Sequence, residues 1–173
     1  MILAIDPGSV QSAFVIWNGK DVIDKGLISN NKVLDLLRVS IPNVRLAIET
    51  ITSFGMPVGA DVFTTCIWIG RFIERWDGTV RLVTRREVKI HLCETMRAKD
   101  ANIRQALVDR FAYGYGNHGK GHKANPSIFY GFKQDIWQAM AVAVTAWDGR
   151  KQQTESVAEA LKERNERWKG DKQ

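Results

Sequence analysis

The sequence has no long apolar run, and no stretch approaches the roughly eighteen unbroken apolar residues that a membrane-spanning helix requires. The short apolar segment at its start has no basic leader, which argues against a secretory signal peptide. We therefore expect a cytoplasmic protein with no membrane partner.

Cysteine is scarce, since Cys66 and Cys93 are the only two in the chain. Their separation matches neither a zinc site nor the disulfide framework of a small secreted protein. Both lie in segments with helical patterning, so we expect reduced thiols buried in the core.

Acidic residues are outnumbered: 19 Asp and Glu stand against 25 Lys and Arg, which gives a net charge of +6 and a pI near 9.5. A basic surface attracts polyanions such as nucleic acid, although many basic proteins simply carry solvated lysines.

The chain has no internal repeat and no phosphate-loop motif. Its 173 residues suit one domain.

What the chain does have is a carboxylate, Asp6, at the end of its first apolar segment, followed by a Pro7-Gly8 turn. An ionised carboxylate at the end of a buried strand needs water, donors or a cation to offset its desolvation. A second apolar segment ends in Glu49 in the same way. Two such strands indicate a shared metal site, and the alternative for Asp6 is a turn-stabilising role before Pro-Gly.

Alternating and β-branched patterns predict a mixed sheet. Asn18-Gly19, between the second and third strands, is typical of a two-residue hairpin turn, so the first three strands are expected to be antiparallel. Asn30 or Asn31 is a suitable cap for a helix that leads to the fourth strand. A right-handed crossover then lays this strand parallel to the first and brings both carboxylates to one edge of the sheet. The five expected strands cover residues 1–6, 10–17, 22–28, 44–49 and 80–83.

A long helix is expected at residues 61–76, with Asp61 as its cap. It is apolar around much of its circumference, so it is either deeply buried or paired with a second subunit. We expect a homodimer through the apolar surface at residues 63–72. Further helices are expected after the capping box at residues 84–87 and after Lys99-Asp100.

Residues 113–131 are rich in Gly, aromatic and basic residues and predict a mobile basic loop. Such a loop is either a flexible connector or a nucleic-acid contact. In the second case Tyr115, Lys120, His122 and Lys123 would touch the backbone or bases.

The last core element is a helix of small apolar residues at 134–148, with Asp135 in its first turn. Residues 150–173 are highly charged and predict a solvent-exposed helical tail.

With these elements placed, the chain resembles the RuvC-type Holliday junction resolvases of the ribonuclease H-like superfamily, phage-encoded members included. The resemblance rests on residues 3–9 (Leu-Ala-Ile-Asp-Pro-Gly-Ser), on Ile-Glu-Thr at 48–50, and on the small-residue pattern at 141–145. It implies an α/β fold in which helices flank a five-stranded mixed sheet, with the nuclease domain at residues 1–149.

In that family, acids from the first strand, the fourth strand and the last helix bind two divalent cations. The resemblance therefore implies Asp6, Glu49 and Asp135 as catalytic metal ligands for Mg²⁺, with Mn²⁺ as a substitute. A helix-cap or salt-bridge role is the alternative for Glu49 and Asp135. Where the family has a further acid in the last helix, this chain has Gln138. An amide is a weak, uncharged ligand, so one metal site is expected to be weaker.

The family also places basic residues near the scissile phosphate. The resemblance implies Lys99 as a catalytic residue and, with Lys89, as a DNA contact; an ordinary surface role is the alternative for Lys99. Phe54 resembles the family's aromatic that stacks on an unpaired base at the junction, and packing on the core is its alternative.

We therefore expect a homodimeric, Mg²⁺-dependent endodeoxyribonuclease that cuts four-way or other branched DNA in a bacterial cell or phage-infected host. The alternative is a junction-binding protein with weak or no cleavage, as Gln138 suggests. An ATPase of the actin and sugar-kinase type also begins with a strand, an Asp and a Gly-containing turn, but the chain has no room for its second domain.

Overall fold

The computed structural model describes residues 1–39, 43–52, 55 and 58–149. Its centre is a five-stranded mixed sheet in the order β3-β2-β1-β4-β5. The first three strands are antiparallel neighbours, while β4 pairs in parallel with β1 and β5 in parallel with β4. This confirms the predicted sheet. Its strands are β1 (Ile2–Asp6), β2 (Gln11–Trp17), β3 (Val22–Ser29), β4 (Arg45–Thr50) and β5 (Val80–Thr84).

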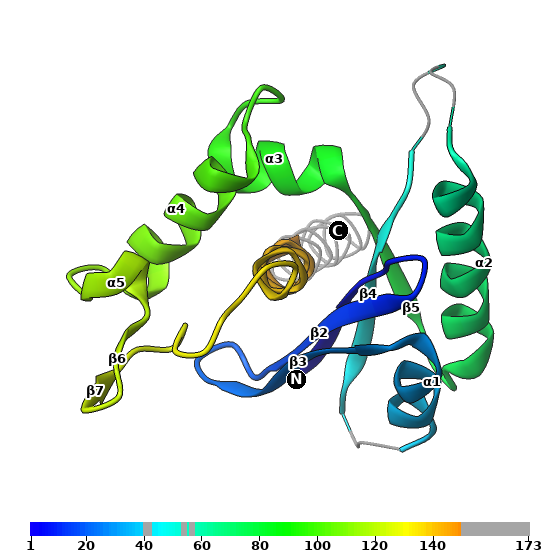
Figure 1. The fold of residues 1–173 in the computed structure, drawn as a ribbon, viewed down its shortest axis with the longest axis horizontal. Helices are drawn as coiled ribbons and strands as arrows, with labels where there is room; N and C mark the ends of the chain where they lie inside the picture. Colours follow the sequence, from blue (N-terminus) through cyan, green and yellow to red (C-terminus); the bar gives the residue numbers. More distant parts are fainter. Residues whose placement is uncertain (40–42, 53–54, 56–57, 150–173) are drawn as a thin grey trace, which may run out of the picture.

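Helices cover both faces of the sheet, so each face contributes its own hydrophobic core (Figure 1). Alternate residues of a strand point to opposite faces. In β1, Leu3 and Ile5 pack towards α1 (Asn30–Arg38) and α2 (Ala60–Arg75). Ile2 and Ala4 pack on the other side, in the core that contains the C-terminal helix. The central strands are therefore apolar along almost their whole length, as a strand buried on both faces must be.

The starts of α1 and α2 differ from the sequence prediction. Ser29, and neither Asn30 nor Asn31, is the N-cap residue of α1, and Gly59 rather than Asp61 is the N-cap residue of α2. In α1 the reason is tertiary. The Asn30 side chain is buried, with 1% of its surface exposed, and its hydrogen bonds are with Gly8 in the turn after β1 and with Ser12 in β2 instead of with its own helix.

The hairpin between β2 and β3 is longer than predicted, because its ladder ends at the pair Trp17 and Val22. Asn18 Oδ1 accepts hydrogen bonds from the backbone N–H groups of Lys20 and Asp21, at 2.8 and 2.7 Å. The side chain of Asn18 therefore closes a wider loop, and the predicted two-residue turn is wrong.

The second face of the sheet carries the C-terminal helix, whose described part is residues 136–149, and the layer of α3 to α5 beyond it (Figure 1). Asp135 precedes this helix instead of lying in its first turn, and the Asp135 carbonyl accepts hydrogen bonds from Gln138 and Ala139 N–H. The bounds of the outer elements are α3 (Arg85–Cys93), α4 (Asp100–Phe111), α5 (Gly116–Gly119), β6 (Gly121–His122) and β7 (Asn125–Pro126).

The segment at 113–131 is not one open loop, since it contains α5 and the small β6-β7 hairpin. Asn117 and His118 both have positive φ, and Gly121 turns with φ of +68°. The expected mobility of this segment stays a prediction. The predicted helical tail at 150–173 lies outside the described residues.

The two thiols are free, but the prediction that both are core residues is wrong. Cys66 is exposed, because the buried side of α2 is formed by Thr65, Ile69 and Phe72. Cys93 is half-buried, and this burial raises the pKa of its thiol. Among the described residues, no helix is both long and apolar enough to span a membrane.

Candidate active site

Asp6 and Glu49 lie next to one another because of the register between their strands. Ile5 of β1 pairs with Ile48 of β4 in parallel, so the next residue of each strand is an acid. Both acids continue the side of the strand that carries Ala4 and Ala47, and those two alanines belong to the core around the C-terminal helix. The parallel pairing therefore directs both carboxylates to the face on which Asp135 lies.

The turn that follows Asp6 is held by a buried polar network. Ser12 Oγ donates to Asn30 Oδ1 at 2.6 Å, and Asn30 Nδ2 donates to the Gly8 carbonyl at 2.9 Å. The Gly8 N–H in turn donates to Ser12 Oγ at 3.3 Å. Ser12 and Asn30 thus fix Gly8 from two elements, and this keeps the end of β1 in one position.

The carboxyl of Asp6 is strongly perturbed. Burial, together with the charges of Glu49 and Asp135, raises the pKa of Asp6 to about 8, and the Arg85 guanidinium only partly opposes this. Burial also raises the pKa of Glu49, against the effect of Arg85. A hydrogen bond between the two carboxyls contributes as well, since it raises the pKa of Asp6 and lowers that of Glu49. Burial and mutual repulsion therefore disfavour a doubly charged pair.

The two carboxylate oxygens of Glu49 differ in their contacts. Its Oε2 atom is buried and forms no hydrogen bond with any described donor. Its Oε1 atom lies 3.7 Å from Nη1 of Arg85. Since burying an unpaired carboxylate oxygen is costly, Oε2 is a suitable donor for a hard divalent cation such as Mg²⁺.

Arg85 and Asp100 complete the surroundings of the acids. Arg85 Nη1 donates to Gln138 Oε1 at 2.6 Å, while its Nη2 forms an ion pair with Asp100 Oδ1. One guanidinium thus lies against Glu49, Gln138 and Asp100 at once.

The predicted metal ligands are only partly assembled. Within the described ranges, no group of three or more His, Cys, Asp or Glu side chains is spaced to hold a metal ion. Asp6 and Glu49 are adjacent, and Asp135 is near enough to act on Asp6 electrostatically. Gln138 is bound to Arg85. The donor set suits Mg²⁺ in its chemistry, and the assignment of these ligands remains a proposal.

Asp148, near the end of the described part of the C-terminal helix, belongs to a different cluster. Arg110 donates to both of its oxygens, at 2.5 and 3.0 Å, and His91 Nε2 lies 2.8 Å from Oδ2. Burial alone would raise the pKa of Asp148, but the hydrogen bonds with Arg110 and His91 lower it. Asp148 therefore interacts with side chains of α3 and α4, and not with Asp6 or Glu49.

The predicted basic residues lie in several places. Lys99 is exposed and immediately precedes α4, whereas Lys89 Nζ donates to the Met96 carbonyl at 3.5 Å. Lys120 is half-buried and lines a pocket next to Asp135. His122 and Lys123 are exposed at the β6-β7 hairpin. Phe54 lies outside the described residues.

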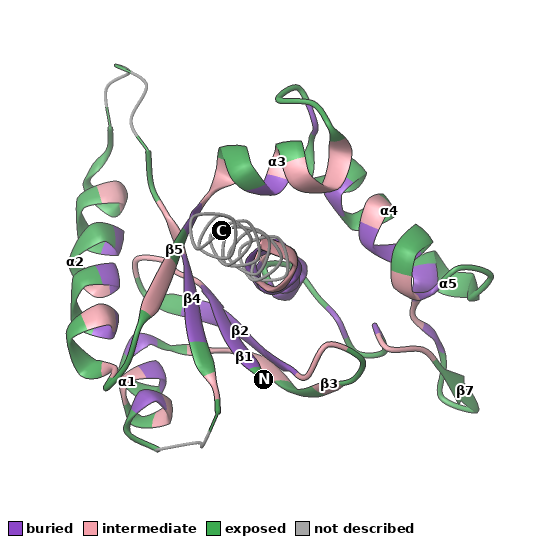
Figure 2. Cartoon of the chain, turned by 180° about the vertical axis from the view of Figure 1, so that it is seen from behind, coloured by how far each residue is buried: buried purple, intermediate pink, exposed green. Residues whose placement is uncertain are grey.

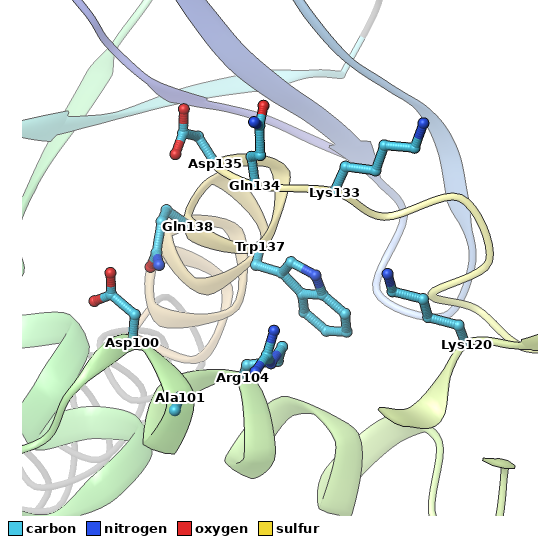
Figure 3. A pocket seen from close by; sticks show the side chains of 9 residues that line it. All are labelled: Asp100, Ala101, Arg104, Lys120, Lys133, Gln134, Asp135, Trp137 and Gln138. Carbon is cyan, nitrogen blue, oxygen red and sulfur yellow. The ribbon is translucent and has the colours of Figure 1, made fainter. Parts of the chain in front are cut away.

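A pocket of about 370 Å³ adjoins the acids and contains residues that the sequence analysis did not single out (Figure 3). Arg104 and Lys133 line it, as does Asp100.

Arg85 is a further site residue that the sequence analysis did not identify. Its place at a helix start was predictable, because it is the first residue after the Thr84 cap, whose capping box with Glu87 is confirmed.

Comparison of the whole chain with solved structures identifies the architecture. The structure of Thermus thermophilus RuvC in complex with a Holliday junction substrate is similar with a TM-score of 0.59 and 15% sequence identity, over 87% of this chain and 95% of that one. The chain has a RuvC-type fold. A second Thermus thermophilus RuvC structure is similar with a TM-score of 0.58 and 17% identity, over 87% and 96% of the two chains.

The similarity is structural. No protein-family model matches the sequence, and no curated protein matches it at a significant level. Within the RuvC-type fold, the expected order of three antiparallel and then parallel strands is confirmed.

Proposed function

We propose that this protein is a metal-dependent, structure-selective endonuclease that resolves four-way (Holliday) or other branched DNA by phosphodiester hydrolysis, in the cytoplasm of a bacterial cell or phage-infected host. The main support is the pair Asp6 and Glu49 at the ends of two parallel strands, with a buried, unbonded oxygen on Glu49. The RuvC-type fold supports the same class of activity by analogy.

In this proposal Asp6, Glu49 and Asp135 hold two Mg²⁺ ions, Mn²⁺ substitutes for them, and Gln138 is a weak further ligand. Bound divalent ions neutralise charge on the phosphate and lower the pKa of the attacking water. The chain's own contribution is position. The network around Gly8 fixes Asp6, and the β1-β4 ladder fixes Glu49 relative to it.

Cationic side chains have the second role. Arg85 already lies against Glu49, and it is placed to balance negative charge at the centre. Lys99 adjoins Asp100 in the chain, at the start of α4, and we propose it as a catalytic residue near the phosphate. Lys89, Lys120, His122, Lys123 and Phe54 are proposed DNA contacts.

The proposed partners are branched DNA and a second copy of the chain. The outward side of α2 exposes Phe63 and Ile67, with 60% and 64% of their surfaces accessible, and it appears green in Figure 2. Large exposed apolar side chains on one helix suit a subunit interface. A two-fold dimer would supply two active sites for two equivalent junction strands.

A junction-binding protein with weak or no cleavage is the second candidate. It is favoured by the hydrogen bond from Arg85 to Gln138, because the amide oxygen of Gln138 that would bind a metal ion already accepts from a cationic side chain of the same protein. In this case Arg85 would take over the part of the site that a metal ion occupies in an active nuclease.

A cleavage assay separates the two candidates. A synthetic four-way junction and the matching linear duplex are incubated with Mg²⁺, Mn²⁺ or EDTA, using the wild type, Asp6→Asn and Glu49→Gln. The nuclease predicts metal-dependent nicks in the junction that both substitutions abolish while junction binding in EDTA persists. Binding without nicks under any metal would favour the second candidate.

A further inference from the structure

We propose that the pocket beside the acidic centre is an anion subsite that holds a second phosphodiester of the DNA strand, next to the one at Asp6 and Glu49. This proposal rests on the proposed function. The pocket has a volume of about 370 Å³ and lies where α4, the turn after α5 and the start of the C-terminal helix meet. Its lining residues are Asp100, Ala101, Arg104, Lys120, Lys133, Gln134, Asp135, Trp137 and Gln138.

Three cations from three separate segments line this pocket. Arg104 comes from α4, Lys120 follows α5, and Lys133 precedes the C-terminal helix. Across the part of the chain that the structure describes, none of their side chains forms an ion pair. Convergent cations without internal partners attract an external anion.

The two sides of the pocket differ in charge. Figure 3 shows Lys120 and Lys133 on one side of Trp137, and Asp100 and Asp135 on the other. Asp100 is already paired with Arg85. A strand whose phosphate reaches the acidic centre therefore finds a basic surface on the far side of the same pocket.

Trp137 indicates which part of a nucleotide the pocket takes. Its indole is only 4% exposed, and it packs against Phe129 and Phe132 with ring centroids 4.8 and 5.1 Å away. A ring so buried has no open face on which a base can stack. The subsite therefore contacts phosphate rather than base, and its contribution should not depend on sequence.

The first experiment measures binding of a four-way junction in EDTA over a range of salt concentrations. The triple variant Arg104→Ala, Lys120→Ala, Lys133→Ala should bind at least tenfold more weakly. Its plot of log K against log[salt] should be shallower by about one unit, as expected for a lost phosphate contact. The matched control Lys20→Ala, Lys32→Ala, Arg75→Ala removes three exposed cations that do not line this pocket and should change neither quantity.

The second experiment locates the contact. Each phosphodiester near the crossover is replaced in turn by a neutral methylphosphonate. One replacement should weaken binding to the wild type but not to the triple variant. An equal loss for both proteins at every position, or a triple variant with wild-type affinity and slope, would overturn the proposal.

A third measurement distinguishes a polynucleotide from a free anion. Protein labelled with 5-fluorotryptophan reports on Trp137 by ¹⁹F NMR, with the resonance assigned through Trp137→Phe. The junction should shift this resonance in the wild type and not in the triple variant. A shift with inorganic phosphate but none with the junction would assign the pocket to a free anion and contradict the proposal. Since these readouts are of binding, absence of cleavage would count against the nuclease only.

Discussion

Arg85 Nη1 donates a 2.6 Å hydrogen bond to Gln138 Oε1, so an internal guanidinium engages the one uncharged member of the proposed ligand set. The same guanidinium pairs with Asp100 and lies 3.7 Å from Glu49 Oε1. Arg85 therefore offsets only part of the negative charge of the acidic centre. The remaining negative charge determines how the site should respond to charge changes.

Gln138→Glu should strengthen Mg²⁺ binding, because it adds a carboxylate next to Asp6, Glu49 and Arg85. At an effective dielectric constant of about 20, such a charge near a divalent ion is worth at least about 1 kcal/mol, or roughly fivefold in affinity. Isothermal titration with Mg²⁺ measures the change. Asn31→Asp, an amide-to-acid change at an exposed position of α1, is the control and should leave affinity unchanged. Weaker binding in Gln138→Glu would contradict a ligand role for this position.

The pKa of Asp6 predicts how the stability of the metal-free protein depends on pH. Since burial and the neighbouring acids raise this pKa to about 8, the folded protein keeps a proton that the unfolded chain releases near pH 4. The contribution of Asp6 to the free energy of unfolding is therefore present below about pH 4 and is lost as the pH rises towards 8.

Asp6→Asn removes this titration. In EDTA at pH 8 the variant should be more stable than the wild type by up to about 5 kcal/mol, since each pKa unit is worth about 1.4 kcal/mol, with the difference vanishing near pH 4. Mg²⁺ should stabilise the wild type more at pH 8 than at pH 6, and Asp6→Asn hardly at all. Urea unfolding at each pH gives these values, and a pH-independent difference between the two proteins would exclude the raised pKa.

Asn30→Ala should destabilise the fold by about 1–3 kcal/mol, because Ser12 and the Gly8 carbonyl would each lose a buried hydrogen-bond partner. Asn30→Asp keeps an acceptor for Ser12 but no donor for Gly8, so an intermediate cost is expected. The exposed neighbour Asn31→Ala should cost much less. Thermal unfolding reports stability, and an Asn30→Ala protein as stable as Asn31→Ala would refute the role of this network.

The double variant Phe63→Glu, Ile67→Glu should be monomeric if the exposed side of α2 is the subunit interface. Light scattering after size exclusion measures the mass, and Asn31→Glu, at an exposed polar position of α1, is the control. The monomer should nick a junction on one strand without the paired second cut. A wild type that is itself monomeric at micromolar concentration would remove the α2 dimer from the proposal.

The order of strands was predictable because the signals are local and physical. Apolar runs that end in Asp6 and Glu49, and a helix long enough for a crossover, determine a parallel pair with both acids at one edge. The loop after Trp17 was not predictable at the same level, because its width depends on hydrogen bonds from Lys20 and Asp21 to the Asn18 side chain. The position of Asn30 was missed for a similar reason, since its partners lie far away in the sequence.

The candidate site likewise contains residues that the local sequence identifies and residues that only the tertiary structure identifies. Asp6 and Glu49 are recognisable from their segments, whereas Arg85, Asp100 and Arg104 look like ordinary charged residues at helix starts or surfaces. Their role appears only when α3 and α4 pack together over the sheet edge. Residues 40–42, 53–54, 56–57 and 150–173 lie outside the described structure, and the predicted roles of Phe54 and the tail stay predictions.

Three helices begin around the acidic centre: α3 at Arg85, α4 at Asp100, and the C-terminal helix just after Asp135. The contacts of Arg85 with Asp100 and Gln138 tie these beginnings together. Because each helix start carries partial positive charge from its peptide dipoles, part of the attraction for a polyanion belongs to the main chain. Replacing side chains one by one cannot remove that part, so even a protein stripped of its nearby lysines should retain some salt-sensitive affinity for DNA.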